Sequence, residues 1–166
     1  MNLEKGIRTI ISEKLRESRI HISFAKDIIN YVELLSKHVR ISGIILYGSV
    51  AYGKPDINSD IDLIVVSPDF DKPYDELTML RRKIAAKRPS RISCIWLGEK
   101  EIIKVFEAFN GFLLDALYYG IILYDEKGIL EGLRKRLERA LKLGNIERKL
   151  GMWRIPIEKG IRKIKI

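Results

Sequence analysis

The sequence predicts a domain of the α/β (α+β) class, a small mixed β-sheet flanked by helices, and three observations support this prediction. Short runs of apolar residues, bounded by glycine, serine or proline, alternate with longer segments of helical periodicity. The chain of 166 residues fits one domain, and its 46% hydrophobic residues suffice for a core. The strand expected at residues 61–66 is almost wholly apolar, as in strands that are covered on both faces.

Two amphipathic helices are expected before the first strand. The first covers residues 3–19, and the second runs from an N-cap at Ser23 to about Lys37. The two histidines, His21 and His38, lie in or beside these helices, and a solvated or capping role is expected for both. The positions expected to face inward are Leu3, Ile7, Ile10, Ile11 and Leu15 in the first helix and Phe24, Ile28, Val32 and Leu35 in the second.

Strands and helices alternate through the rest of the chain. Gly48 ends the first strand, Pro89 ends the helix before the third strand, and Gly111 and Gly120 punctuate the later segments. The expected strands are residues 41–47, 61–66 and 91–97, with a short edge strand at 121–124. The expected helices are residues 74–87, 99–109, 112–119 and 126–143.

The positive charge of the chain is unevenly distributed. The sequence carries 31 Lys+Arg and 22 Asp+Glu. Residues 127–166 hold 13 of the basic and 4 of the acidic residues, which leaves 18 of each sign in the first 126. Attraction to RNA, DNA or an acidic partner is one interpretation of this segment, and an ordinary solvated helix surface is the other. The basic side chains expected on the outer face of the last helix are Arg134, Lys135, Arg136, Arg139 and Lys142.

Composition argues against several classes of protein. No apolar run approaches the roughly 18 residues that span a bilayer. The N-terminus is amphipathic rather than a signal peptide, so a cytoplasmic protein without membrane contact is expected. The single cysteine, Cys94, excludes an internal disulfide and is interpreted as a small core residue. The absence of Gln and the abundance of Ile, Lys, Arg and Glu are typical of hyperthermophiles.

The segment at residues 46–66, LYGSVAYGKPDINSDIDLIVV, carries the residues of chemical interest. Asp60 and Asp62 share one face of the second strand, because side chains alternate along a strand. Two adjacent carboxylates at the start of an apolar strand are costly unless a cation compensates, and such oxygen ligands suit Mg²⁺ or Mn²⁺. Gly48 and Ser49 end the neighbouring strand, where backbone N–H groups and a hydroxyl can receive a phosphate. If the two strands are adjacent, phosphate and metal meet, which fits nucleotidyl transfer.

The pattern is a Gly-Ser turn, ten intervening residues and D-x-D, with the pentapeptide SDIDL at residues 59–63. It resembles the DNA polymerase β-like nucleotidyltransferase superfamily and, within it, the minimal nucleotidyltransferase (MNT) proteins of archaeal type. The resemblance covers residues 41 to about 97 well. It implies a nucleotidyltransferase domain at residues 41–125, preceded by N-terminal helices at 1–40 and followed by a basic C-terminal helix and tail at 126–166.

The resemblance also implies a nucleoside triphosphate substrate, with ATP favoured, and Mg²⁺ or Mn²⁺ as cofactor. On this basis Asp60 and Asp62 are the catalytic metal ligands. The residues expected to bind the nucleotide are Gly48, Ser49, Ser59 and Lys54.

Two positions depart from the family pattern. The family usually places a third carboxylate on the next strand, where this sequence has Ser93. Glu99 and Glu101 follow that strand and could take the place of the third carboxylate from a different backbone position. A true absence of this carboxylate is expected instead. Many relatives have Arg where Tyr52 stands, and Lys54 is a nearby point charge without the bidentate geometry of Arg. Nucleotide binding is therefore expected to be retained more securely than turnover.

Two functions are consistent with these residues. In the first, the chain is an enzyme that transfers a nucleotidyl group. Small relatives pair with helical partners of the HEPN class, so the resemblance implies an antitoxin-like role with a protein acceptor, and RNA or a small molecule are alternatives. In the second, Ser93 in place of the third carboxylate has abolished catalysis, and the domain binds nucleotide, nucleic acid or a partner protein.

Three further residues are expected to have structural roles. Asp115, in an apolar helix, is expected to pair with a basic residue or cap a turn. Trp96 and Trp153 are expected to anchor the core or an interface.

Overall fold

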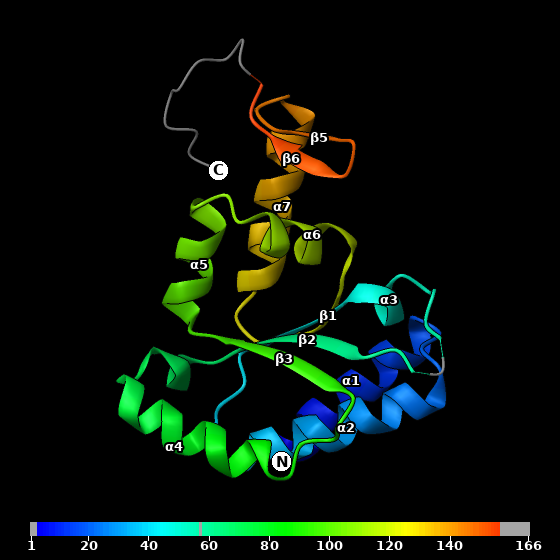
Figure 1. Ribbon diagram of the computed structural model, residues 1–166, viewed down its shortest axis with the longest axis vertical. Helices are drawn as coiled ribbons and strands as arrows, with labels where there is room; N and C mark the ends of the chain where they lie inside the picture. The colour runs from blue at the N-terminus through cyan, green and yellow to red at the C-terminus, as the bar shows by residue number, and fades with distance from the viewer. Residues whose placement is uncertain (1–2, 57, 157–166) are drawn as a thin grey trace.

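Four strands form a mixed sheet in the computed structural model, which describes residues 3–56 and 58–156 (Figure 1). Their bounds are β1 (Gly43–Tyr47), β2 (Ile61–Val66), β3 (Ile92–Leu97) and β4 (Ile121–Asp125). The order across the sheet is β3-β2-β1-β4. β1 runs antiparallel to β2 and β4, whereas β2 and β3 are parallel. The expected fold class, including an edge strand at β4, is confirmed.

Three helices cover the face of the sheet that is lower in Figure 1: α1 (Leu3–Glu17), α2 (Ile22–Ser36) and α4 (Tyr74–Ala85). Alternate strand residues, such as Leu46 and Leu63, point into this layer and join one apolar cluster. Ile10 was expected inside but is 47% exposed, because the buried stripe of α1 advances in steps of four residues. The inward positions that are confirmed are Ile7, Ile11, Leu15, Phe24, Ile28, Val32 and Leu35.

Three further helices cover the opposite face: α5 (Glu99–Glu107), α6 (Gly111–Tyr119) and α7 (Ile129–Lys142). Ile45, Ile64 and Val66 point into this layer and form a second apolar cluster with the helices. The sheet is thus the middle of three layers, and its central strand β2 is buried on both faces. Two short elements close the ends of the strands: α3 (Gly48–Ala51) follows β1, and the 3-10 helix η1 (Pro68–Asp71) follows β2.

The starts of α2 and α7 differ from the expected ones. α2 begins at Ile22, and its N-cap is His21, whose Nδ1 accepts a hydrogen bond from the Ser23 backbone N–H at 3.3 Å. The expected cap at Ser23 is therefore wrong, while the capping role expected for a histidine is confirmed at His21. α7 begins at Ile129 rather than at residue 126, because Gly128 before it has φ +70° and breaks the helical backbone.

Two of the five basic residues expected on the outer face of α7 turn back onto the protein. Arg134 donates hydrogen bonds to the carbonyls of Leu117, at 2.8 Å, and Gly120, at 2.9 Å. Arg136 lies over the Phe106 ring, 5.2 Å from its centroid. Part of the positive charge of the C-terminal segment is therefore used to hold α5, α6 and α7 together.

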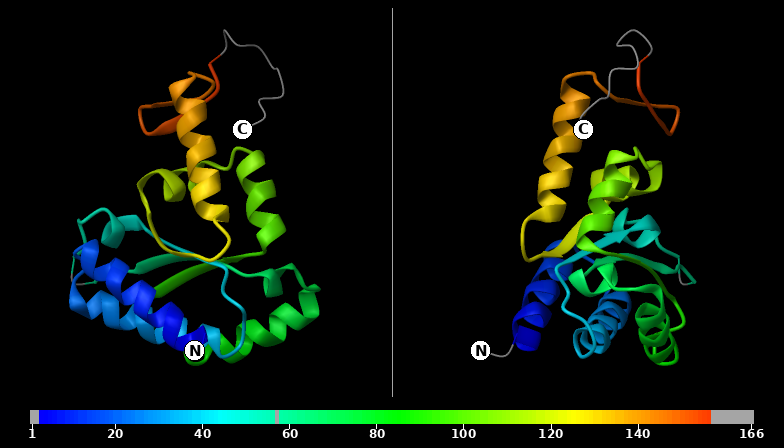
Figure 2. Two further views of the ribbon diagram at one scale, coloured as in Figure 1. Left: turned by 180° about the vertical axis from the view of Figure 1, so that it is seen from behind. Right: turned by 90° about the vertical axis from the view of Figure 1, so that its left-hand side faces the viewer.

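A small hairpin follows α7 and was not expected from the sequence. Its strands are β5 (Glu147–Lys149) and β6 (Met152–Arg154), and they form a separate two-stranded sheet. The hairpin lies above α6, on the side of the sheet that also carries α5 and α7 (Figure 2). The alternating ending of the chain, for which pairing as a strand was one expectation, lies outside the described residues. Within the described part of the chain, no helix is both long and apolar enough to cross a membrane.

Candidate active site at the ends of β1 and β2

The Gly-Ser turn and the second aspartate meet where β1 ends and β2 begins. Because the two strands are antiparallel, Tyr47 at the end of β1 lies opposite Asp62. Gly48 comes next and has φ +72°, a conformation that favours glycine. A Cβ atom at this position would overlap Oδ2 of Asp62 and lie 3.2 Å from its Cγ. Glycine is therefore required here both by the backbone and by the close approach of the carboxylate.

The loop between the strands is shaped by local hydrogen bonds. The N–H of Tyr52 donates to the carbonyl of Gly48 at 3.1 Å, and the N–H of Lys54 donates to the carbonyl of Ser49 at 3.0 Å. These bonds make the single turn of α3, whose first N–H groups have no partner within so short a helix. Ser49 is half-buried and the Lys54 side chain is exposed. This turn therefore holds Gly48 beside the Asp62 carboxylate, and Ser49 and the exposed Lys54 follow it in the loop.

The other end of the loop holds the first aspartate. The hydroxyl of Ser59 accepts a hydrogen bond from the N–H of Asp56 at 2.8 Å. The N–H of Asn58 donates to Oδ1 of Asp56 at 2.7 Å, which closes a local turn. Asp60 follows, exposed, directly before β2. Ser59, which was expected to bind nucleotide, therefore has a structural bond that orders the approach to Asp60.

The electrostatics of the carboxylate pair are unfavourable for two ionised groups. Burial and, secondly, the neighbouring charge of Asp60 raise the pKa of Asp62, and a hydrogen bond from Ser93 opposes this rise. Burial, together with the charge of Asp62, also raises the pKa of Tyr47. A site that concentrates negative charge in partly buried surroundings is one in which a bound cation is stabilising.

Ser93, which stands where the resemblance implied a third carboxylate, lies beside Asp62. In the parallel pairing of β2 and β3, Ser93 is directly opposite Asp62, and its hydroxyl hydrogen-bonds that carboxylate. Glu99 and Glu101 follow the opposite end of β3, where Leu97 pairs with the last residue of β2. Neither reaches the pair: Glu99 accepts from Lys127 at 2.8 Å, and Glu101 accepts from the N–H of residue 98 at 3.2 Å.

Two carboxylates are the anionic ligands that this end of the sheet offers. Across the described residues, no group of three or more His, Cys, Asp or Glu side chains is arranged to hold a metal ion. Asp60 and Asp62 nevertheless fit a hard divalent cation, because Mg²⁺ is commonly bound by one or two carboxylates and completes its shell with waters and substrate phosphates. The arrangement thus suits one ion bound together with a phosphate-bearing substrate.

α6 and the hairpin are joined by side chains that the sequence did not connect with each other. Asp115 on α6 accepts hydrogen bonds from Nε1 of Trp153, at 2.9 Å, and from Nε of Arg148, at 3.1 Å. The pairing with a basic residue expected for Asp115 is confirmed, and it docks the hairpin on α6. A carboxylate within an apolar helix signalled a partner, but nothing in the sequence indicated that the partner was a hairpin more than thirty positions later.

Comparison with known protein families shows the family to which this chain belongs. A model described as Polymerase beta, Nucleotidyltransferase matches residues 27–128, which is more than half of the chain and includes the turn, both aspartates and β3. The chain belongs to the polymerase β nucleotidyltransferase family. Membership in this superfamily was predicted from the Gly-Ser turn and the D-x-D strand, and it is confirmed; the MNT and archaeal assignments stay predictions.

Solved structures similar to this nucleotidyltransferase-family chain are distant. One is described as a toxin-antitoxin with AMP-PNP, with 19% identity, a TM-score of 0.47, and coverage of 70% of this chain and 88% of the other. Another is a mutant of the toxin-antitoxin MntA-HpeT, with 17% identity, a TM-score of 0.46, and coverage of 70% and 87%. A comparison with curated proteins finds no match.

Proposed function

We propose that this chain binds a nucleoside triphosphate with Mg²⁺ or Mn²⁺ and transfers a nucleotidyl group to an acceptor, with release of pyrophosphate. The observation that carries the proposal is the contact between Gly48 and Asp62. It sets the Gly-Ser turn against a carboxylate whose pKa is raised by burial and by Asp60. Phosphate and cation would therefore be received at one place, as nucleotidyl transfer requires.

The residues of the site then take the following roles. Asp60 and Asp62 hold the metal ion, whose charge would neutralise phosphate oxygens. Gly48 and Ser49 receive phosphate through backbone and hydroxyl donors, and Lys54 adds positive charge from the exposed loop. Ser59 acts through its bond to the loop, which positions Asp60. ATP is the favoured nucleotide, on the resemblance described above.

A second function is favoured by one specific observation, the hydrogen bond between Ser93 and Asp62. A neutral hydroxyl at this register position leaves the acceptor hydroxyl without a carboxylate that could bind a second ion or take its proton. In this alternative the domain binds nucleotide, nucleic acid or a partner protein without turnover.

Label transfer tests the first function. The protein is mixed with each α-labelled nucleoside triphosphate and Mg²⁺ or Mn²⁺, with total RNA or total cell protein as acceptor. Transfer is expected from the wild type and from Asp75→Asn, an exposed carboxylate on α4, and is expected to be lost in Asp60→Asn and Asp62→Asn. Label in the protein fraction would point to a partner such as the HEPN-type protein that the resemblance implies. Equal transfer by Asp60→Asn would show that the proposed metal site is wrong.

Substitution at position 93 separates the two functions. Ser93→Asp puts a third carboxylate directly opposite Asp62. If the natural site is degenerate, this variant gains transfer activity while the wild type only binds nucleotide, seen as a rise in melting temperature with ATP and Mg²⁺. If the natural site is active, Ser93→Asp changes the rate little or lowers it, and Ser93→Ala serves as the control for loss of the hydroxyl.

A further inference from the structure

The strand β3 forms one edge of the larger sheet, because it pairs with β2 alone within the part of the chain that the structure describes. The Ile61 N–H donates to the carbonyl of Arg91 at 2.8 Å, so the odd-numbered residues of β3 direct their main-chain groups toward β2. The N–H and C=O groups of Cys94 and Trp96 therefore point to the open edge. An open strand edge of this kind is a template for a further strand.

A hollow of about 390 Å³ separates this open edge from α4, the helix that lies below β3 in Figure 1. Tyr31, Ile84 and Trp96 form its floor, and Tyr31 and Ile84 are almost completely buried. Arg81 on α4 and Arg88 just after it also line the hollow. An exposed sheet edge with a pocket beside it is how many proteins take up an extended peptide as an additional strand.

The floor of the hollow is fixed by contacts among its own side chains. Nε1 of Trp96 donates to the Tyr31 hydroxyl at 3.1 Å, and the Phe70 ring stacks on Trp96 with ring centroids 4.6 Å apart. The guanidinium of Arg81 lies 5.8 Å from the ring centroid of Trp96. Because these side chains are already ordered, a ligand that enters the hollow loses little affinity to side-chain ordering.

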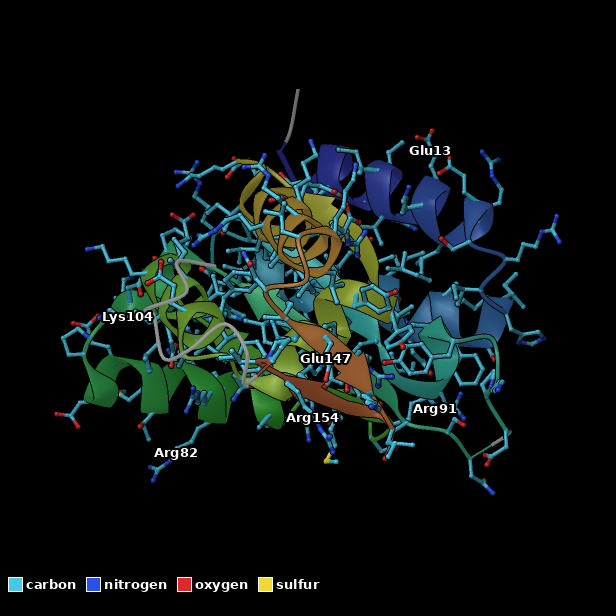
Figure 3. All side chains as sticks on the ribbon, turned by 90° about the horizontal axis from the view of Figure 1, so that it is seen from above. Glu13, Arg82, Arg91, Lys104, Glu147 and Arg154 are labelled. Carbon is cyan, nitrogen blue, oxygen red and sulfur yellow. The ribbon has the colours of Figure 1, made fainter. Side chains whose placement is uncertain are left out.

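The side of the molecule that carries the hollow is strongly basic. Residues 81–91 include six basic residues and no acidic one. Within the described ranges, neither Arg81 nor Arg88 is in an ion pair. Arg82, in the same run, extends from α4 away from the molecule (Figure 3). The hollow therefore offers positive charge to a ligand.

We infer that the open edge of β3 binds an extended acidic segment of a partner protein as an additional strand. The main chain of this segment pairs with Cys94 and Trp96. Side chains opposite these two residues point to the same face of the sheet as they do, toward the layer of α2 and α4. Carboxylates at those positions enter the hollow and meet Arg81 and Arg88.

Two features favour a peptide strand of another protein over other occupants. The open edge repeats its donors and acceptors every two residues, about 6.6 Å, which a peptide main chain matches. A phosphodiester backbone has no N–H donors and cannot pair in this way. A second copy of this chain, pairing through its own β3, would bring two runs of residues 81–91 together, and their like charges would repel.

The hollow and the candidate active site lie on opposite faces of the sheet. Cys94 and Trp96 pack against the apolar cluster that contains Ile61 and Leu63. Asp62 lies between these two residues on β2, so its side chain points to the other face. Peptide binding can therefore be measured independently of the proposed transfer.

Fluorescence anisotropy of a labelled peptide tests this inference. The probe is a fluorescein-labelled peptide of about eight residues, a common strand length, in which Glu and Val alternate. Three comparators are the same peptide with every main-chain N–H methylated, the peptide with Lys in place of Glu, and a single-stranded oligonucleotide of equal charge. The wild type is expected to bind the probe in preference to all three, because only the probe offers both main-chain donors and carboxylates.

Substitutions on α4 test the part played by the two arginines. Arg81→Ala and Arg88→Ala are each expected to weaken binding of the probe roughly twofold to fivefold, because each removes one exposed partner of a carboxylate. Lys83→Ala is the charge-matched control. Lys83 is exposed and stands about 200° around the helix from Arg81, away from the hollow, so this variant keeps full binding.

Amide hydrogen exchange followed by NMR reports on the open edge itself. The bound probe is expected to slow exchange of the Cys94 and Trp96 amides, whereas Ser93 and Ile95, which already pair with β2, change little. The same result is expected from Asp62→Asn without metal, even if the transfer assay fails.

Four outcomes would overturn the inference. They are no binding of the probe by the wild type, equal binding of the N-methylated peptide, unchanged binding by both arginine variants with their melting temperatures intact, and binding that leaves exchange at Cys94 and Trp96 unaltered. Preference for the oligonucleotide would also overturn it, and would assign residues 81–91 to nucleic acid.

Discussion

The contact between the turn and the carboxylate makes a quantitative prediction for Gly48→Ala. The new side chain would sit at φ +72°, which costs about 1–2 kcal/mol for a residue with a Cβ. It would also overlap Oδ2 of Asp62 and approach that residue's own Cβ to 3.3 Å, and overpacking of this kind costs about 1–3 kcal/mol. The free energy of unfolding should therefore fall by roughly 2–5 kcal/mol, a large share of the 5–15 kcal/mol of a typical domain.

Gly53→Ala is the matched control for this prediction. Gly53 has φ +70°, but nothing lies within 4 Å of the Cβ it would gain, so only the backbone cost of about 1–2 kcal/mol applies. Urea unfolding followed by circular dichroism measures both variants. Combining Gly48→Ala with Asp62→Ala should bring its cost down toward that of Gly53→Ala, because the overlapping atoms are gone. If Gly48→Ala alone is no more destabilising than Gly53→Ala, the carboxylate does not pack on the turn, and the reasoning about the site is refuted.

Three further predictions follow from side chains away from the turn. Asp115→Ala removes the acceptor for Trp153, so trypsin should cleave the β5–β6 hairpin faster while the midpoint of global unfolding barely moves; unchanged cleavage would contradict the docking role. Arg134→Met removes two hydrogen bonds to carbonyls at the end of α6 and should cost about 2–3 kcal/mol, against roughly zero for the exposed Lys135→Met in the same urea titration. Hydrogen bonding by Lys127 lowers the pKa of Glu99, so the ionised carboxylate stabilises the fold fully above about pH 4.3, the ordinary pKa of a glutamate. This stabilisation is lost as the pH falls through the lowered pKa. The difference in the free energy of unfolding between the wild type and Glu99→Gln should therefore close over that acid range and stay constant above it.

Local sequence patterns predicted most of the helices and strands and the carboxylates of the candidate site. Apolar runs bounded by turn residues predicted the four strands of the larger sheet, and the period of two placed Asp62 on the face of β2 opposite Ile61 and Leu63. These inferences held because each depends on neighbours within a few residues, which the sequence displays directly. The same locality explains the errors: the cap of α2 and the burial of Ile10 turn on one-residue shifts that periodicity does not resolve.

What lies around the carboxylates was decided by contacts between segments far apart in the chain. The sequence alone showed Gly48, Asp60, Asp62 and Ser93 as residues of the right chemical kind, and the position of Ser93 as the departure from the family pattern. Only the antiparallel pairing of β1 with β2 and the parallel pairing of β2 with β3 brought them to one end of the sheet. The docking of the hairpin on α6 through Asp115 needed the fold as well. Spacing along a chain constrains local geometry, whereas packing of distant surfaces depends on how whole elements bury their apolar faces together.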